Sequence, residues 1–487
     1  MADPKVFASS VEIKYCYITP NKEGSKPFDA TQGVLRFDYF EDIESPTIFA
    51  SLVIGEESMN SMISEIPLQG AEAVQIRFKT AVDDKEHTYH FRVYKIYARY
   101  VTDRFQTYTL GLISQEALSN EMVRMGTVLK GLPSEIVLKL LKENLQTEKK
   151  VIVDKAVNPI KLFPGKKTPF SIIETLKMKS IAQEGGNIVT SQTKKYNLGG
   201  RAGAKLKEKE VQTGGVASVK GTDKAAKGSA GYLFWENKAG YNFKSMDKLY
   251  DKTENVPVTT YYQQNTQLAD DPRFVISNVE FDKEIDLLDK LRHGAYSSVI
   301  CFYNYSTGSY EEYGYSLDEQ FKEMNHLGPQ SGVTSSQATF STFPTRIMSV
   351  LLDHETWHNT EDVASPEDKD GGGKNTAKYP DWQKSYTAQS IARFNTFNNQ
   401  QLEIKVPGNP ALKVGDTIDV KIMNQKSNKN DPGQTYDPEH SGVYLISKLN
   451  HAFVPKQPIT ETFLTLIRDV YGDETTDVET TNDVLLY

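Results

Sequence analysis

The sequence predicts a β-rich α+β protein with two antiparallel β-barrel modules and a smaller α+β module. Two long regions, residues 11–124 and 401–469, alternate apolar and polar residues with the period of a half-buried strand. At about Gly126 the apolar period lengthens to that of a helix. The chain has 487 residues, which exceeds the usual size of a single core, so three or four domains are expected.

Residues 1–125 are expected to form the first β module. The region contains six candidate strands that are joined by short turns, which is typical of a small sandwich or barrel. In one of these strands Val74, Ile76 and Phe78 alternate with polar residues and should share a buried face. A short helix is expected from Glu57 to Ile66.

Residues 126–272 are expected to form the α+β module. Pro133 begins one candidate helix, and Thr168 and Pro169 begin another, with threonine as the N-cap and proline at the first helical position. Residues 183–230 are rich in glycine and basic residues and contain one aromatic residue, Tyr196. Such a segment buries too little surface to offset its ordering entropy, so we expect a flexible insertion there.

Residues 273–470 are expected to hold the second β module, built from residues 273–316 and 401–470. A helix with Asp282 as its cap should end at Gly294, and a second helix should run from Tyr386 to Phe397. Residues 316–385 interrupt the pattern and are treated as an insertion. The acidic residues 471–487 are expected to form a flexible C-terminal tail.

Four spaced patterns, in this order, resemble the central baseplate hub proteins of contractile-tailed bacteriophages, the myovirus tail hub family. They are I-x-L-x-G-x-E-x-V-x-I-x-F at residues 66–78, F-x-E-N-x-x-G-Y-x-F-x-S at 234–245, G-x-Y-S-S-x-x-x-x-x-N-x-x-T-x-x-Y at 294–310, and L-x-V-G-D-x-I-x-V at 412–420. The resemblance covers about three quarters of the chain through spaced patterns.

This resemblance implies a structural virion protein and no catalytic or cofactor-binding residues. Hubs of this family are homotrimers whose two tail-tube-like domains per chain form a ring of six around a channel. The implied partners are the trimeric tail spike, the hexameric tail tube, baseplate wedge proteins and the tape measure protein. DNA is expected to pass through the channel without specific binding. The implied location is the tail baseplate of the virion, after assembly in the host cytoplasm, or a phage-derived injection system.

Composition is compatible with that interpretation. The formal net charge of −8 disfavours sequence-specific nucleic-acid binding, which depends on basic patches. No apolar run approaches the roughly 18 residues that would span a membrane, and the N-terminus lacks the pattern of a secretory signal. Cys16 and Cys301 lie far apart in expected strands, which favours buried, reduced thiols.

One motif supports an alternative function, a zinc metallopeptidase. Residues 354–358 read HETWH, in which His354 and His358 would bind zinc and Glu355 would act as general base. The context is unfavourable, because a strand-like segment precedes the motif and the third-ligand position of one zinc family is Ala364. We therefore expect a polar loop and no bound metal.

Other candidate sites are weaker still. His87 and His90 alternate on one strand, without an acidic partner at ligand spacing. The glycines in residues 197–203 lack the strand, helix and lysine of a phosphate-binding loop. No Ser-His-Asp set can be identified. A cell-surface adhesin made of β-barrel modules is a third alternative, which the missing export signal disfavours.

Overall fold

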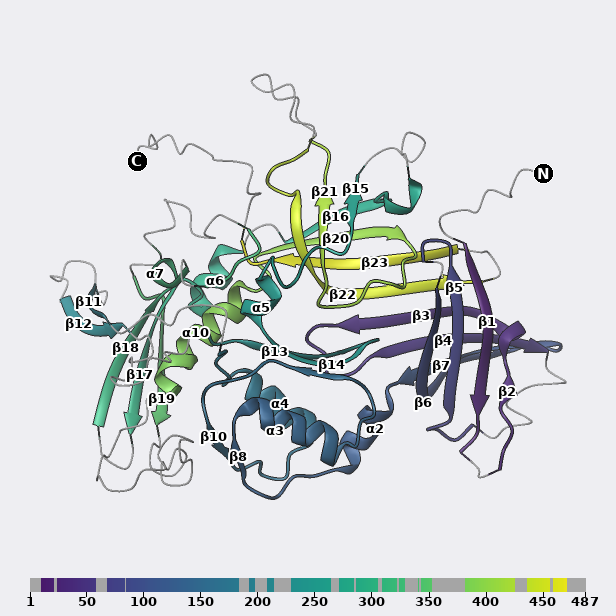
Figure 1. The fold of residues 1–487 in the computed structure, drawn as a ribbon, viewed down its shortest axis with the longest axis horizontal. Coiled ribbons are helices and arrows are strands. Elements are labelled where there is room, and N and C mark those ends of the chain that lie inside the picture. Colours follow the sequence, from purple (N-terminus) through teal and green to yellow (C-terminus); the bar gives the residue numbers. More distant parts are fainter. Residues whose placement is uncertain are drawn as a thin grey trace.

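The computed structural model describes residues 10–21, 24–57, 68–83, 85–183, 192–197, 208–213, 229–263, 271–283, 286–304, 309–321, 324–328, 340, 343–352, 382–424, 436–455 and 459–470. The protein is β-rich, and its largest element is a sheet of 13 strands that runs through both expected β modules. In Figure 1 the yellow strands of the second module continue directly into the purple strands of the first.

The first β module is antiparallel throughout, with the strand order β2-β1-β5-β6-β7-β4-β3. Its elements are β1 (Val11–Thr19), β2 (Phe28–Asp29), the 3-10 helix η1 (Thr31–Gly33), β3 (Val34–Asp42), β4 (Phe49–Glu57), β5 (Ala73–Thr80), β6 (Glu86–Val101) and β7 (Phe105–Ile113). As predicted, Val74, Ile76 and Phe78 on β5 are buried. Cys16 on β1 is a buried free thiol.

The second β module has the strand order β15-β21-β22-β23-β20-β16. Its elements are β15 (Thr260–Tyr262), the 3-10 helix η4 (Pro272–Phe274), β16 (Asn278–Lys283), β20 (Gln400–Pro407), β21 (Thr417–Lys421), β22 (Gly442–Val454) and β23 (Ile459–Arg468). Leu402, Ile404 and Val406 on β20 are buried, as the alternation predicts. Their burial places the other face of this sheet toward solvent.

The two modules have matching strand orders, as expected. In chain order, β1, β3, β4, β5, β6 and β7 correspond to β15, β16, β20, β21, β22 and β23. One direction differs, because β15 runs parallel to β21 whereas β1 is antiparallel to β5. The modules lie side by side because β3 pairs with β22, and residues from both modules form one hydrophobic core.

The α+β module packs below the large sheet in Figure 1 and has a hydrophobic core of its own. Its elements are α2 (Gln115–Met122), β8 (Leu129–Gly131), α3 (Pro133–Lys139), the π-helix η3 (Leu140–Asn144), β9 (Val151–Val153), β10 (Ile160–Leu162), α4 (Pro169–Lys177), β13 (Tyr232–Asn237), β14 (Gly240–Ser245) and α5 (Met246–Tyr250). The predicted start of α4 is confirmed: Pro169 follows the N-cap Thr168, whose side chain accepts a hydrogen bond from the Ser171 N–H.

A five-stranded sheet lies at the opposite end from the first module in Figure 1. It contains β11 (Gln192–Asn197), β12 (Glu208–Thr213), β17 (Ser297–Asn304), β18 (Ser309–Ser316) and β19 (Arg346–Leu352), and it lies with α6 (Leu287–His293), α7 (Leu317–Phe321) and α10 (Trp382–Thr396). The placement of residues 297–316 in the second β module is therefore wrong. Both edges of β17 are occupied by β18 and β19, so β17 cannot join the large sheet.

Two further expectations need correction. The N-cap of α6 is Asp286, because Asp282 lies within β16; the helix ends at Gly294 in the left-handed conformation, as expected. Within the expected insertion at 183–230, β11 and β12 pair antiparallel with each other, so these segments are strands and not loop. The helix expected from Glu57 to Ile66 lies outside the described residues, apart from Glu57, which ends β4. No described helix is long and apolar enough to cross a membrane.

Candidate functional site

The pairing of β3 with β22 joins the two β modules and is called here the β3–β22 junction. The strands are antiparallel, with Asp42 opposite Lys448 at one end and Phe37 opposite Phe453 at the other. The same edge of β22 pairs with β21 over its first residues, from Gly442 to Leu445. One long strand therefore belongs to its own module along half of its edge and holds the neighbouring module along the other half.

Aromatic side chains fill the core beneath the junction. Phe37 stacks on Phe453 with ring centroids 5.9 Å apart, and Phe453 also contacts Phe78 at 4.0 Å. Tyr39 stacks on His451 at 5.9 Å. These side chains come from both modules, and each aromatic pair adds about 0.5–1.5 kcal/mol beyond the area it buries. The junction is therefore a packed core as well as a ladder of backbone hydrogen bonds.

Glu41 is a buried carboxylate at the centre of this region. It accepts hydrogen bonds from the Tyr39 hydroxyl at 2.5 Å, from the Lys238 N–H at 2.6 Å and from the Val414 N–H at 2.7 Å. Burial raises the pKa of Glu41 to about 7, although these three hydrogen bonds act in the opposite direction. One side chain of the first module thus holds backbone groups of the α+β module and of the second module.

The β13–β14 hairpin, which carries the F-x-E-N-x-x-G-Y-x-F-x-S pattern, meets the same point. The indole N–H of Trp235 and the amide of Asn237 both donate to the Val414 carbonyl, at 3.1 and 3.0 Å. Gly240 has a φ of +129°, and a Cβ there would lie 2.1 Å from the Lys150 carbonyl oxygen. The glycine of this pattern is therefore required by a positive φ and by a close backbone approach.

A charge cluster fixes the hairpin to the rest of the α+β module. Lys149 Nζ lies 2.6 Å from Glu116 Oε2 and 2.5 Å from Glu236 Oε1. Burial lowers the pKa of Lys149, but the two carboxylates outweigh that effect and raise it. Glu236 also accepts a hydrogen bond from the Ile48 N–H at 3.2 Å, so the cluster reaches the first β module.

A second buried ion pair connects α5 with α10, the helix that precedes β20. Arg393 Nη1 lies 2.7 Å from Asp247 Oδ1, and both side chains are almost fully buried. Asp247 Oδ2 accepts hydrogen bonds from the Ser229 N–H at 2.9 Å and the Ser229 hydroxyl at 2.6 Å. A buried charge that lost its partner here would be strongly destabilising. The pair therefore holds the α+β module against the segment that leads into the second β module.

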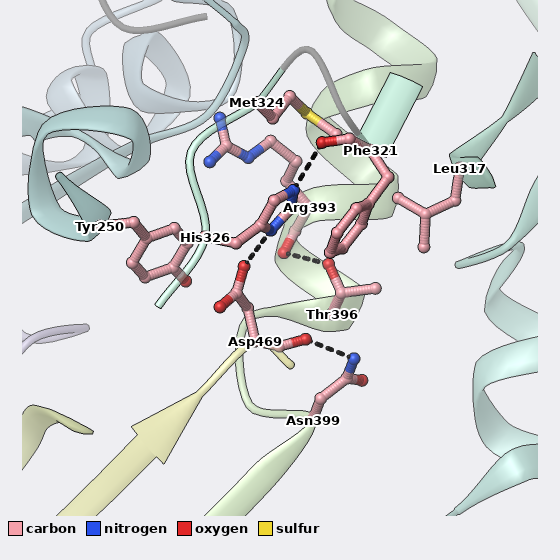
Figure 2. A pocket seen from close by; sticks show the side chains of 9 residues that line it. All are labelled: Tyr250, Leu317, Phe321, Met324, His326, Arg393, Thr396, Asn399 and Asp469. Carbon is pink, nitrogen blue, oxygen red and sulfur yellow. Dashed lines mark hydrogen bonds and ion pairs between the residues drawn. The ribbon is translucent and has the colours of Figure 1, made fainter. Parts of the chain in front are cut away.

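A small cavity next to this pair is the candidate for chemistry (Figure 2). It has a volume of about 10 Å³, near the minimum for a single water molecule. It is lined by Tyr250, Leu317, Phe321, Met324, His326, Arg393, Thr396, Asn399 and Asp469. A substrate of the size of a peptide or nucleotide does not fit in this volume.

His326 and Asp469 in that cavity form a pair that resembles part of a catalytic triad. His326 Nδ1 lies 2.5 Å from Asp469 Oδ2, and its Nε2 lies 2.9 Å from the Phe321 carbonyl oxygen. In a triad Nε2 faces a nucleophile. Here a carbonyl occupies that place, and the nearby Thr396 hydroxyl donates to main-chain carbonyls of its own helix. The pair acts as a structural link between the segment after α7 and the end of β23.

The sequence-predicted site residues do not form a site together. His354, Glu355, His358 and Ala364 lie outside the described residues. Across the ranges that are described, no group of three or more His, Cys, Asp or Glu side chains could hold a metal ion. His87 has the acidic partner that the sequence analysis missed, since its Nε2 lies 2.9 Å from Asp83 Oδ2.

The remaining candidates are placed as follows. His90 is opposite Gln75 on β5, and Cys301 is a buried free thiol on β17. Of residues 197–203, Asn197 ends β11 and the rest lie outside the described residues.

The residues that hold the modules together were not identified from the sequence, although signals were present. Glu41 follows Phe37 and Tyr39 at a spacing of two residues, so it falls on the buried face of its strand. His451 lies in the same way between Leu449 and Phe453. A polar residue at an apolar position of a strand indicates a buried, hydrogen-bonded group. Lys149 and Asp247 carry no comparable signal.

Several solved structures are similar to this chain. A tail protein from Neisseria meningitidis MC58 has a TM-score of 0.47 and 11% identity, covering 94% of this chain and 96% of that one. The 43 kDa tail protein of prophage MuSo2 from Shewanella oneidensis has a TM-score of 0.47 and 9% identity, covering 94% and 98%.

A third structure is an E. coli component of the type VI secretion system described as similar to T4 bacteriophage tail proteins. It has a TM-score of 0.39 and 9% identity, covering 96% of this chain and 79% of that one. No family model and no curated protein matches the chain.

Proposed function

We propose that this chain is a structural protein, the central hub of a contractile tail baseplate. The observation that carries the proposal is the presence of two β modules with matching strand orders, side by side in one sheet. A chain built in this way presents two nearly equivalent units to a partner. The motif resemblance supplies the identity of that partner, the tail tube.

Symmetry explains the use of two units in one chain. Three copies around a threefold axis present six similar modules, which can face a hexameric tube on one side. The same trimer offers true threefold symmetry to a trimeric spike on the other side. A monomer or a dimer cannot match both partners. We therefore propose a homotrimer that joins the tail tube to the central spike, with wedge proteins and the tape measure protein as further partners.

The solvent-exposed face of the large sheet is the candidate wall of a DNA channel. The opposite face is filled by the shared core, so this face is free to line a lumen. Three of its basic side chains are paired with acidic neighbours: Arg36 with Asp38 at 2.7 Å, Lys405 with Glu461 at 2.6 Å, and Lys448 with Asp42 at 3.5 Å. Binding to DNA depends on basic groups that can neutralise phosphates. Paired charges on an acidic chain favour passage of DNA without binding.

The mechanism that we propose is mechanical. Forces between tube and spike would pass through the β3–β22 junction and through the buried contacts of Glu41, Lys149 and Arg393. In the described part of the chain the cavity is too small for a substrate and its histidine is already engaged, so we propose no enzymatic activity. The proposed location is the tail baseplate of a virion assembled in the host cytoplasm.

The proposal is tested by the mass of the particle in solution. Size-exclusion chromatography with light scattering should give about three times the 54.8 kDa of one chain. A permanent interface usually buries more than about 2,000 Å², so the mass should persist on dilution. Negative-stain images of the same sample should show a ring with a central hole. A monomer or dimer, both alone and with the spike protein added, would contradict the proposal.

A further inference from the structure

The large sheet contains two unpaired strand edges that are equivalent to the two strands of the β3–β22 junction. One is the second half of β6, the counterpart of β22, beyond its pairing with β5. The other is β16, the counterpart of β3, at one end of the sheet. Of the described strands, β16 pairs with β20 alone. The edge of β6 that faces β5 is paired from Glu86 to Arg92, and no described strand continues that ladder to Val101.

The equivalence extends to the register of single residues. In the first module Arg92 pairs with Ile113 and Ala73, and in the second Leu445 pairs with Ile467 and Thr417. Both long strands then have a register shift at the same place, between Val93 and Lys95 in β6 and between Ile446 and Lys448 in β22. β6 has a second shift, between Tyr97 and Tyr100, which the ladder of β22 with β23 lacks. A bulge at a matching position means that the strands leave their modules in the same manner.

This register identifies the residues that would meet. Tyr100 on β6 corresponds to Ala452 on β22, since their partners Thr107 and Glu461 lie six positions before Ile113 and Ile467. Gln401 and Phe49 correspond because they pair with the equivalent residues Ile467 and Ile113. Glu280 on β16 therefore corresponds to Asp38 on β3, since their partners Glu403 and Ser51 each lie two positions after Gln401 and Phe49. Within the chain, Ala452 lies directly opposite Asp38. By the same register, Tyr100 would lie opposite Glu280.

Exposure distinguishes the paired strands from the unpaired ones. In the junction Ala452 and Asp38 are buried, at 6% and 7% exposure. Their counterparts are open: Tyr100 is 70% exposed and Glu280 is also exposed. Large apolar side chains lie on the same two edges, namely Tyr94, Ile96, Tyr97, Tyr100 and Val101 on β6 and Phe281 on β16. A long, exposed and apolar strand edge is a site for pairing with another chain.

We propose that the β6 edge from Lys95 to Val101 pairs antiparallel with β16 of a second copy of this chain, with Tyr100 opposite the partner's Glu280. The proposal deepens the proposed function and rests on it for the number of copies. Arg99, which precedes Tyr100 on β6, would lie near the partner's Glu280, so the charges are complementary.

The contact is head-to-tail, because a β6 edge of one copy meets a β16 edge of the next. Head-to-tail contacts close into a ring when their rotation allows it. If each contact repeats the geometry of the β3–β22 junction, intrachain and interchain steps alternate around the ring. The large sheet would then continue from copy to copy, and the β6 and β16 edges would both be covered.

Cysteine cross-linking tests this pairing. The double variant Tyr100→Cys/Glu280→Cys, treated with a short bismaleimide, should migrate on a denaturing gel as a single species of three chains. Both positions are exposed in the single chain, so its fold should not depend on them. Cys16 and Cys301 are buried, and each single-cysteine variant serves as a control for their reactivity.

Two matched pairs calibrate the reaction. Asp42→Cys/Lys448→Cys, an accessible pair in the junction, should cross-link within one chain and stay at the mass of a monomer. Thr88→Cys/Glu280→Cys uses the half of β6 that β5 already covers and should not cross-link. A trimer by light scattering without a cross-link between positions 100 and 280 would overturn the strand pairing and leave the proposed function intact.

Failure of the proposed function has a different signature. A monomer by light scattering, with no cross-link, would overturn both proposals. Cross-linked species of more than three chains on the gel would support the strand pairing and overturn the threefold ring.

A charge exchange gives an independent measurement. Tyr100→Glu places a carboxylate opposite the partner's Glu280, and like charges directly opposite each other are destabilising. This variant should dissociate at a protein concentration at least tenfold higher than the wild type. Adding Glu280→Lys should restore assembly, because the pair then has opposite charges. If both variants and the wild type dissociate at the same protein concentration, the proposed pairing of Tyr100 with the partner's Glu280 is contradicted.

Discussion

Glu41 on β3 accepts a hydrogen bond of 2.7 Å from the backbone N–H of Val414, which is 373 positions away in the sequence. The same carboxylate accepts from the Lys238 N–H, so three parts of the chain meet at one buried group. Val414 also accepts hydrogen bonds from Trp235 and Asn237 through its carbonyl oxygen. The modules are therefore joined by specific polar contacts as well as by apolar packing.

The close contact between Gly415 and Trp235 leads to the first prediction. Gly415 has a φ of +92°, and a Cβ there would lie 2.5 Å from Trp235 Cζ2. Gly415→Ala should lower the free energy of unfolding by about 3 kcal/mol, from the left-handed backbone and from overpacking. Urea unfolding at one fixed protein concentration measures this change. The control is Gly70→Ala, at φ +106° with open space around its Cβ, which should cost about 1 kcal/mol. Equal losses would contradict the predicted clash.

The second prediction concerns Lys149, which lies between Glu116 and Glu236. Lys149→Met leaves the fully buried Glu236 without its cation and should cost about 3–5 kcal/mol in urea unfolding. Lys14→Met, which removes an exposed pair with Glu12, should cost less than about 1 kcal/mol. Adding Glu236→Gln to Lys149→Met should recover part of the loss, because the uncompensated charge is removed. A loss as small as that of Lys14→Met would mean that the cluster does not support the hairpin.

The third prediction is a pH dependence that arises from His451. Burial, together with the charges of Lys238 and His87, lowers the pKa of His451 from 6.5 to about 3. The pKa of His451 is lower in the folded state than in the unfolded state. The stability that the neutral ring contributes is therefore fully present above pH 6.5 and is lost as the pH falls. Between pH 6.5 and pH 5 this loss amounts to about 2 kcal/mol.

His451→Asn removes the titrating group and should show a correspondingly smaller loss over the same interval. The measurement is urea unfolding of both proteins from pH 8 to pH 5. Above pH 7 the free energies of unfolding of the two proteins should change with pH in parallel, which provides the control. Parallel curves down to pH 5 would show that the ring is protonated in the folded protein.

Local features of the fold were predictable because they depend on neighbouring residues. Val74, Ile76 and Phe78 on β5 alternate strictly, and an alternating strand has a single buried face. Thr168 and Pro169 likewise determine the start of α4 through local capping chemistry. The matching of the two modules was also expected, since both regions showed long alternating strands.

Long-range pairing was not predictable in the same way. The junction pairs Asp42 with Lys448, and nothing in the period of either strand identifies its neighbour. The strands at 297–316 were assigned to the wrong sheet for this reason, because their pattern fits either sheet equally well. No local pattern identifies the role of Lys149, since its two carboxylates come from distant segments.

The fourth prediction is that the purified protein carries no bound zinc. The pentad at 354–358 follows β19, a strand, whereas the peptidase motif requires a helix that places both histidines on one face. Elemental analysis of protein purified without chelators measures the metal directly. His354→Ala should leave the metal content unchanged. One tightly held zinc per chain that is lost in this variant would favour the metallopeptidase alternative.

The last prediction follows from the charges on the solvent-exposed face of the large sheet. Because Arg36, Lys405 and Lys448 are paired with carboxylates, the wild-type protein should pass through a column of immobilised duplex DNA at physiological salt.

A charge-neutralised protein is the matched comparison. The combined variant Asp38→Asn/Asp42→Asn/Glu461→Gln removes the three partners and leaves three free basic groups on that face in each copy. It should be retained at low salt and elute as salt is raised. The logarithm of its binding constant for DNA should fall with the logarithm of the salt concentration, with a slope of about −0.9 for each phosphate contact. Light scattering checks that the variant still assembles. Retention of the wild type at physiological salt would indicate basic groups in the channel that can bind DNA and would contradict passage without binding.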